Sequence, residues 1–380
     1  MKLPPVSNIN ILLIIWAIIN GIIIFSNGII TDGEAVKYIS EANKLLDTGS
    51  LTATNYWFYF TQITLLAIAF KLKLGYTFVV IVQLFFSAWA MLAFYRLAAS
   101  LFSKQTALAG TLIFLLNYSY HEFNTYVQTE SLFHSFTIIF TSYLLRLNRL
   151  TLLNAIIIFL STILICITRP TGLLLVPGIA LYLFFTFFKA IGTRIKIGIV
   201  AVSGIAFLVL MNAVIGSKGE WDFMLPYLDE RIICGVPTLH HFVDIKTDPN
   251  GDSIFGLYYY IVHNFDQFIR MAFLRSKAFF GLLRTYYGRG HNTYLAVFFY
   301  PLYAAALLSL GWWWKHQANR LLYLSCVVSM TWLTTLLTCD DWHNRWFLTI
   351  SPWIILAGLP AITKLFTIFT PNGDKRYIQQ

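Results

Sequence analysis

The sequence predicts an all-α, polytopic membrane protein with about ten transmembrane helices, an interfacial or re-entrant helix, and loops on the outer face. Hydrophobic residues make up 58% of the 380 residues, charged residues make up 12%, and the mean hydropathy is +0.67. Soluble domains carry about 25% charged residues. Many apolar residues also fall in runs near the ~20 residues that a helix needs to cross a bilayer. These observations exclude a large soluble domain.

The apolar runs define the expected helices in chain order. They lie at 9–30, 57–72, 76–99, 105–118, 130–148, 151–168, 172–190, 195–215, 291–314, 318–339 and 346–369. The first run is too long for a signal peptide and lacks a small-residue cleavage site. We therefore expect it to be an uncleaved first helix.

Basic residues between the runs predict the topology. The expected cytoplasmic groups are Lys2, Arg96 with Lys104, Arg146 with Arg149, Lys189 to Lys196, Lys315 with Arg320, and Lys375 with Arg376. The positive-inside rule accounts for the net charge of +10, so no nucleic-acid partner is needed. With Asp32 outside and Arg96 inside, an odd number of crossings must separate them. The run 57–72, interrupted by Gln62, is therefore expected to be re-entrant or interfacial.

Three parts follow from this topology. We expect a transmembrane catalytic module at 1–215, an outer-face loop or lid at 216–290, and C-terminal transmembrane helices at 291–380. Segment 216–290 is the longest hydrophilic segment, and we expect it to lie on the membrane. A disulfide between Cys234 and Cys339 on the outer side is an open alternative.

Asp32 and Glu34 are the first candidate catalytic residues, because they follow the first apolar run directly. A carboxylate at this membrane face is placed to take a proton from an attacking hydroxyl. The alternative is helix capping, in which Thr31 or Asp32 caps a helix that starts near Glu34.

A second group of polar residues precedes the run at 130–148. His121 and Glu122 are candidate substrate ligands, and Glu130 stands directly before apolar residues, so its charge needs a partner. Arg169, at the outer Thr168–Gly172 corner, opposes the positive-inside bias. A guanidinium there suggests a bound phosphate. The alternatives are a structural ion pair with Glu130 and a side chain that extends to the membrane interface.

A third group lies between the last two runs, where acids, a histidine and an arginine fall within six residues. The candidates for substrate binding are Asp340, Asp341, His343 and Arg345. We favour phosphate recognition over a metal site, because the spacing of these ligands is not diagnostic of a metal. From 216–290 and the residue after it we add Arg284, Arg289 and His291. The other basic residues of that segment, among them Arg270, Arg275 and Lys277, are expected to be surface anchors.

These segments together resemble the GT-C glycosyltransferases, in particular the bacterial branch near the protein O-mannosyltransferases and the aminoarabinose transferases. The matching pieces, in chain order, are Asp32-Gly33-Glu34 with Tyr38 and Ala42, Thr129 to Phe133, Thr168 to Leu173, and His343 to Trp346 with Pro352. The resemblance implies that Asp32 is the catalytic carboxylate and that Arg169 and Arg345 contact the donor phosphate. Some relatives have a folded soluble domain after the last span, and we expect no such domain here.

The expected function is inverting transfer of a sugar from a polyprenyl-phosphate donor to a hydroxyl of a glycan, lipid or protein. The resemblance implies a bacterial inner-membrane protein with its site facing the periplasm. No soluble cofactor is required, and a divalent cation, Mg²⁺ or Mn²⁺, is compatible with this chemistry. One alternative is a lipid-linked polysaccharide polymerase or ligase. The other is a transporter or flippase, although no internal repeat is visible. No Walker loop or dinucleotide fingerprint is present.

Overall fold

The computed structural model describes residues 7–188, 191–215, 224–234, 245–248, 251 and 253–369. Within these residues the regular structure is helical, and the only β contacts are two isolated bridges, Ile30 with Tyr126 and Ile233 with Asp340. The predictions for Lys2, Lys189, Lys375 and Arg376, and for much of 216–252, lie outside the described residues. The all-α prediction is confirmed for the part of the chain that is described.

The chain forms two compact units. The first comprises Met1–Leu173, Pro301–Ala318 and Pro352–Gln380, and the second comprises Leu174–Tyr300 and Asn319–Ser351. The predicted three-part division at 215 and 290 stays a prediction. Each unit is described by itself below.

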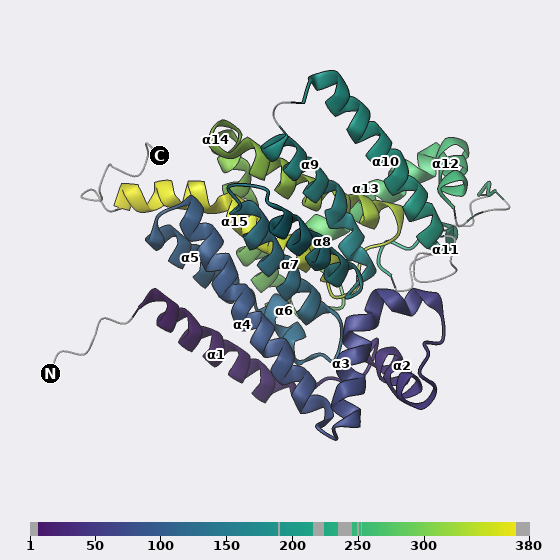
Figure 1. The fold of residues 1–380 in the computed structure, drawn as a ribbon, viewed down its shortest axis with the longest axis horizontal. Coiled ribbons are helices and arrows are strands. Elements are labelled where there is room, and N and C mark those ends of the chain that lie inside the picture. The colour runs from purple at the N-terminus through teal and green to yellow at the C-terminus, as the bar shows by residue number, and fades with distance from the viewer. Residues whose placement is uncertain are drawn as a thin grey trace. The chain divides into compact units, whose positions relative to one another are not determined.

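The first unit begins with a long helix and a short amphipathic one. In order, its elements are α1 (Asn8–Asn27), α2 (Ala35–Thr48), η1 (Thr54–Tyr59), α3 (Phe60–Lys71), α4 (Gly75–Leu101), α5 (Lys104–Leu115), α6 (Tyr118–His121), η2 (Glu122–Thr125), α7 (Glu130–Leu145) and α8 (Leu152–Cys166). Helix α4 packs against α5 and α7, and α1 contacts both α4 and α5 (Figure 1).

The second unit contains the shorter helices of the loop region. After η3 (Pro170–Leu174), at the boundary of the units, come α9 (Leu175–Phe187), α10 (Thr193–Ile215), α11 (Met224–Leu228), α12 (Ile254–His263) and α13 (Phe265–Gly281). Helix α14 (Arg289–Leu337) bends at the non-helical residue Gln317, and α15 (Arg345–Phe369) contains Pro352 and Pro360. Both helices are divided between the units, since Pro301–Ala318 of α14 and the part of α15 from Pro352 onward belong to the first unit. The predicted runs 291–314 and 318–339 thus correspond to the two arms of α14.

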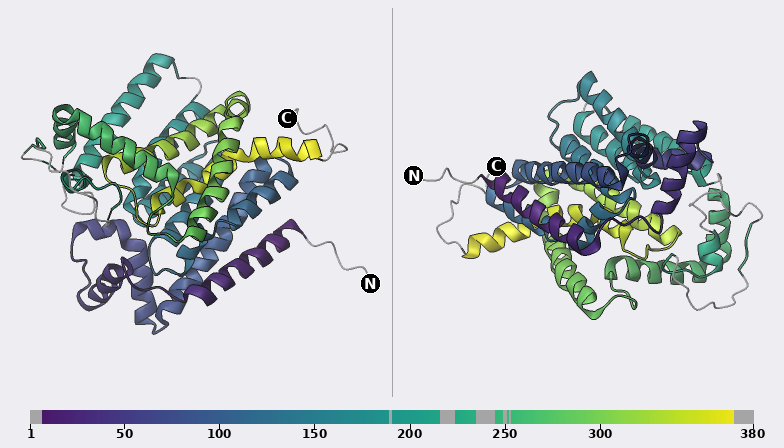
Figure 2. Two further views of the ribbon diagram at one scale, coloured as in Figure 1. Left: turned by 180° about the vertical axis from the view of Figure 1, so that it is seen from behind. Right: turned by 90° about the horizontal axis from the view of Figure 1, so that it is seen from below.

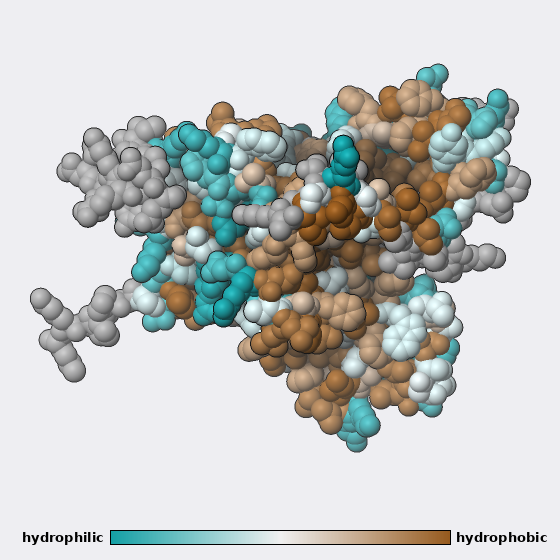
Figure 3. All heavy atoms as spheres, turned by 45° about the horizontal axis from the view of Figure 1, so that its top comes forward, coloured by the Kyte–Doolittle hydropathy of each residue, from teal (hydrophilic) through white to brown (hydrophobic). Residues whose placement is uncertain are grey.

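Among the described residues, five helices are long and apolar enough to cross a membrane: Asn8–Asn27, Gly75–Leu101, Pro170–Phe187, Arg289–Leu337 and Arg345–Leu365. The chain is therefore a multi-pass helical membrane protein. The predicted count of about ten spans is not confirmed. Helices α5, α7 and α8 have 12, 16 and 15 residues, because each ends before its apolar run does. Much of the face displayed in Figure 3 is hydrophobic, as expected for a surface that meets lipid.

Helix α3 covers most of the run that the topology predicted to be re-entrant or interfacial. It has 12 residues, so its length is about 18 Å, well short of the ~30 Å hydrocarbon core. It packs on α2 in every view (Figures 1 and 2). A single crossing by this helix is thereby excluded on length.

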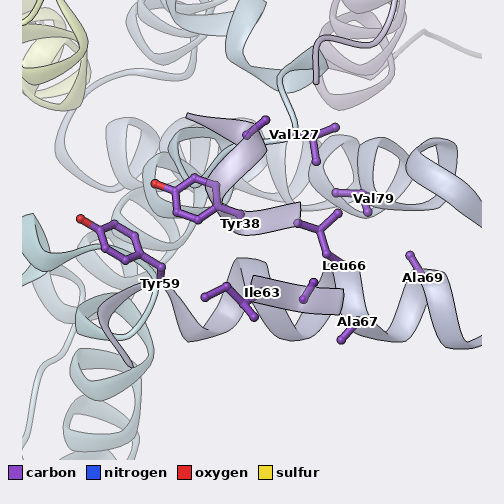
Figure 4. Packing of buried hydrophobic residues seen from close by; sticks show 10 residues of the cluster. Tyr38, Tyr59, Ile63, Leu66, Ala67, Ala69, Val79 and Val127 are labelled. Carbon is purple, nitrogen blue, oxygen red and sulfur yellow. The ribbon is translucent and has the colours of Figure 1, made fainter. Parts of the chain in front are cut away.

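A cluster of buried apolar side chains joins α2, α3 and α4 to the segment that precedes α7. Tyr38, Tyr59, Leu66 and Val127 are among its members (Figure 4). Tyr38 and Tyr59 lie at one end of the cluster with ring centroids 5.3 Å apart, and their hydroxyls point away from it. This packing fixes α2, and hence the loop before it, against the rest of the unit.

A network of buried polar side chains lies behind the same loop. Asn124 donates to Asn20 Oδ1 (2.7 Å) on α1 and to Ser87 Oγ (3.0 Å) on α4. Ser131, on α7, donates to Asn124 Oδ1 at 2.7 Å. Asn124, in η2, therefore links this element to three helices. Buried amides need such partners, because an unmade hydrogen bond is costly in an apolar interior.

Asn124→Leu should destabilise the protein by about 1–3 kcal/mol, because it leaves Asn20 and Ser131 buried with a lost partner. The measurement is unfolding of the purified protein in mild detergent. Asn43→Leu is the matched control, since Asn43 is exposed on α2. Equal stability of the two variants would contradict the role assigned to Asn124.

Candidate active site

The loop after α1 is held by backbone pairing with the turn before α7. Ile30 N–H donates to the Thr125 carbonyl at 3.0 Å, and Val127 N–H donates to the Ile30 carbonyl at 2.9 Å. Gln128 Nε2 donates to the Asp32 carbonyl at 3.4 Å. The predicted segments 31–34 and 121–130, about 90 residues apart in sequence, therefore lie next to each other.

Gly33 gives the loop its sharp turn into α2. Its φ is +60°, in the left-handed region that favours glycine. The Ala35 N–H then donates to the Asp32 carbonyl at 3.2 Å, which starts α2. The turn brings Asp32 out of the helical register and exposes its side chain.

The capping role considered for Thr31 and Asp32 is wrong. Helix α2 begins at Ala35 with Glu34 at the N-cap, and no side chain caps it. The Asp32 carboxylate is exposed and has no hydrogen-bond or ion-pair partner among the described residues. It is therefore available to an incoming group.

Glu34 is held more firmly than Asp32. Its carboxylate accepts a hydrogen bond from the Tyr38 hydroxyl at 3.2 Å and lies 3.7 Å from Lys37 Nζ. The Lys37 ammonium lies 5.0 Å from the ring centroids of both Tyr38 and Tyr59. Of the two predicted catalytic carboxylates, Glu34 thus has a hydrogen bond and an ion pair, and Asp32 has neither among the described residues.

Two of the predicted acids act on Tyr126 electrostatically. Burial and the charges of Glu122 and Asp32 raise the pKa of Tyr126 to about 12. Burial raises the pKa of Glu122 to about 7 and lowers the pKa of His121 to about 4. The His121 Nε2 lies 3.2 Å from the Phe114 carbonyl, consistent with a neutral ring that donates through Nε2.

Glu130 has the partner that its position requires. Arg169 Nη1 donates to Glu130 Oε1 at 2.5 Å, and the side-chain exposures are 11% for Arg169 and 0% for Glu130. Glu130 also opens α7, where the helix dipole favours a negative charge. The ion pair considered as an alternative for Arg169 is therefore present. No other hydrogen bond from its guanidinium is made within the described residues, so Nε and Nη2 remain available as donors.

In the second unit, each of the two acids of the 340–345 segment forms an ion pair with an arginine. Arg284 Nη2 donates to Asp340 and, at 2.5 Å, to Asn344. Arg345 donates to Asp341 through both Nε (2.9 Å) and Nη2 (2.7 Å). These are two buried, charge-balanced pairs, and the Arg345 pair is bidentate.

The other candidates of the second unit surround the same segment. The hydroxyls of Tyr286 and Tyr287 donate to the Trp342 carbonyl at 2.6 and 2.9 Å, and the His343 ring contacts Trp342. The rings of Tyr287 and His291 are 4.5 Å apart. Arg289, at the start of α14, is exposed.

A disulfide joins Cys234 to Cys339, with their Cα atoms 5.4 Å apart. The pairing left open by the sequence is therefore present. The bridge between Ile233 and Asp340 runs beside it, with Cys234 N–H donating to the Asp340 carbonyl at 2.7 Å. Together they fasten the segment after α11 to the polar segment before α15.

The expectation that Arg275 is a surface anchor is wrong. Arg275 has 0% exposure and lies over the Tyr227 ring at 4.4 Å. Its guanidinium donates to the carbonyls of Arg231, Leu336 and Pro226. Carbonyl dipoles solvate this charge in place of a carboxylate. The spacing of buried residues on α13, Gln267, Met271, Arg275 and Phe279, carries the signal that sequence reasoning missed.

The predicted residues fall into two groups. Asp32, Glu34, His121, Glu122, Glu130 and Arg169 belong to the first unit, while Arg284, Arg289, His291, Asp340, Asp341, His343 and Arg345 belong to the second. Among the described residues, no group of three or more His, Cys, Asp or Glu side chains is arranged to hold a metal ion. Comparison with protein-family models, curated proteins and solved structures gave no match.

Glu130→Gln should cost about 3–5 kcal/mol of stability, because it leaves the guanidinium of Arg169 without its counter-charge. The double variant Glu130→Gln with Arg169→Gln should lose less than the sum of the two single losses. Asp229→Asn is the control, since Asp229 forms a half-exposed pair with Arg231, worth about 0–1 kcal/mol. A Glu130→Gln variant no less stable than Asp229→Asn would contradict this assignment.

Glu122 should make folding stability depend on pH. Its pKa is about 7 in the folded protein, against an ordinary 4.5. Between these values the unfolded chain gives up its proton and the folded protein keeps it, so stability falls as the pH rises from about 4.5 to about 7. Glu122→Gln removes this contribution. The gain in melting temperature over wild type should therefore be larger at about pH 8 than at about pH 5, and an equal gain at both would rule the shift out.

Proposed function

We propose that this protein is a membrane glycosyltransferase of the GT-C type that transfers a sugar from a polyprenyl-phosphate donor to a hydroxyl acceptor. The observation that supports it most is the Asp32 carboxylate, which is exposed and unpaired within the described residues at the end of the first membrane-crossing helix. The resemblance of segments 32–34, 129–133 and 168–173 to that family points the same way. We place the site on the periplasmic side of a bacterial inner membrane.

Asp32 serves as the general base in this proposal. The acceptor oxygen attacks the anomeric carbon and its proton passes to the carboxylate. The bond between the anomeric carbon and the phosphate oxygen breaks, and polyprenyl phosphate leaves with the electron pair. The new glycosidic bond forms on the opposite face, so the configuration inverts. The leaving phosphate is already anionic, and no general acid is needed.

Arg169 is our candidate for stabilising the leaving phosphate. Glu130 takes only Nη1 of its guanidinium, which fixes the orientation of the group and leaves Nε and Nη2 as donors. A well-placed donor to a developing oxyanion contributes about 3–4 kcal/mol to transition-state stabilisation. Glu130 thus acts on the donor through Arg169 and is a positioning residue.

The residues of the second unit keep a narrower role. Asp340 and Asp341 already neutralise Arg284 and Arg345, so we assign these four residues to shaping the 340–345 segment. Arg289 is exposed and His291 and His343 are half-buried, and we propose that they bind the substrate. A divalent ion is not required for the mechanism.

Asp32→Asn should reduce sugar transfer by about 10²–10⁴-fold, the usual effect of losing a positioned base. The assay uses purified protein in lipid with a labelled polyprenyl-phosphate sugar, and melting temperature verifies folding. Glu34→Gln is the control, because Glu34 is tied to Tyr38 and Lys37, and it should retain most activity. Near-normal transfer by a folded Asp32→Asn protein would remove Asp32 from the mechanism.

Competition between donors separates the proposed reaction from that of a polysaccharide polymerase or ligase. A polyprenyl-monophosphate sugar should compete with the labelled donor, whereas a lipid-diphosphate glycan should not. Preference for the diphosphate would favour the polymerase or ligase. Lipid flux in proteoliposomes without sugar transfer would favour a flippase.

A further inference from the structure

Helices α12 and α13 of the second unit have apolar faces that are exposed in the described part of the chain. On α13, Phe265, Ile269 and Phe273 are 57%, 49% and 69% exposed. They are spaced four residues apart and therefore form one row along the helix. On α12, Phe255, Tyr258 and Val262 are also exposed, at a spacing of three and four. Six large apolar side chains thus face outward on two successive helices.

The opposite faces of the same two helices are buried in the protein. Tyr260 of α12 and Met271 of α13 pack with Met224 and Tyr227 in one cluster. Arg275 is fully buried on this side and binds three carbonyls. The inward faces of α12 and α13 therefore pack within the protein, and the exposed apolar residues do not belong to this core.

Helix α12 is too short to cross a bilayer, and α13 is at the lower limit of the required length. Helix α12 has 10 residues, about 15 Å of helix, and α13 has 17 residues, about 26 Å, against a hydrocarbon core of ~30 Å. Helix α13 also carries Asp266, Arg270 and Lys277 on its exposed side. A charged residue in the bilayer core costs several kcal/mol in insertion measurements. An apolar row beside such charges instead fits a helix that lies in the membrane interface.

We propose that α12 and α13 lie flat in the membrane–water interface on the outer side of the membrane. The rows Phe255–Tyr258–Val262 and Phe265–Ile269–Phe273 then lie at the boundary between headgroups and acyl chains. Lys277 extends the α13 row by one turn and can bind an anionic lipid headgroup while its stem stays among the chains. The chain continues from α13 through the exposed Leu283 and Tyr286 into α14, a candidate span that begins at Arg289. The lipid surface met by α14 is thus continuous with the one assigned to α13. This inference is independent of the glycosyltransferase proposal.

The test measures where the α13 row lies relative to lipid. Cys166 and Cys326, the free cysteines of the described chain, are replaced by serine, and the Cys234–Cys339 disulfide is kept. Single cysteines at Phe265, Ile269, Phe273 and Asp266 are then labelled with a polarity-sensitive fluorophore. The protein is held in nanodiscs of phosphatidylcholine with some phosphatidylglycerol. Asp266→Cys is the matched control, because it is exposed on the same helix next to the row.

At Phe265, Ile269 and Phe273 we expect emission shifted to shorter wavelength and loss of fluorescence with a nitroxide placed near the top of the acyl chain. Aqueous iodide should quench the Asp266 position and spare these three. Equal quenching by iodide at all four positions would place the row in water. Stronger quenching by a nitroxide at the chain end would show deep insertion. Protection from both quenchers, with cross-linking between copies, would show a protein interface. Each of these three results overturns the proposal.

Discussion

The candidate site depends on the backbone pairing between Ile30 and Tyr126. A loop beside a low-dielectric phase must find partners for its N–H and carbonyl groups. Here the loop after α1 and the turn before α7 provide them for each other. Gln83, buried on α4, supports the turn by donating to the carbonyls of Phe123, Asn124 and Tyr126. Because the backbone is satisfied in this way, the side chains of the loop are left for other contacts.

The charged side chains of the two units are stabilised in two ways. Buried charges have partners: Glu130 binds Arg169, Asp340 binds Arg284, and Arg275 is solvated by carbonyls. Asp32 is exposed instead, and an exposed carboxylate needs no internal partner. This contrast is what separates a reactive candidate from structural ion pairs, since a buried ion pair mainly avoids the cost of an unpaired charge.

Sequence patterns predicted the helices well, while the predicted number of spans is not confirmed. Each apolar run with described structure contains a helix, because hydrophobicity over such lengths is enough to specify one. Helix length was less predictable. Helix α5 ends at Leu115, two residues before Asn117, and α7 ends at Leu145, directly before Arg146, so polar residues near the ends of the apolar runs shorten both helices. The run 57–72 was predicted to be re-entrant or interfacial from the number of crossings between Asp32 and Arg96. Its helix, α3, is too short for a full crossing.

The site could be predicted only to the level of segments. That Glu130 needed a partner and that Arg169 could supply one followed from charge burial alone. The hub role of Asn124 could not be predicted, because it depends on Asn20 and Ser87, which stand in runs that read as uniformly apolar. Arg275 was misassigned for a related reason. A basic residue among aromatics suggests an interfacial anchor, while the geometry that buries it comes from the carbonyls of distant residues.

The central claim is that Asp32 takes the acceptor's proton at the anomeric carbon of a lipid-phosphate sugar. A density map of the protein in nanodiscs with a bound, unreactive polyprenyl-phosphate sugar tests it most directly. A hydrogen bond from the acceptor hydroxyl to the carboxylate and an attack distance of about 3–3.5 Å together place the anomeric carbon within about 6 Å of an Asp32 oxygen. Density for the sugar at that position would support the account. A sugar bound farther away than one acceptor oxygen can bridge would contradict it.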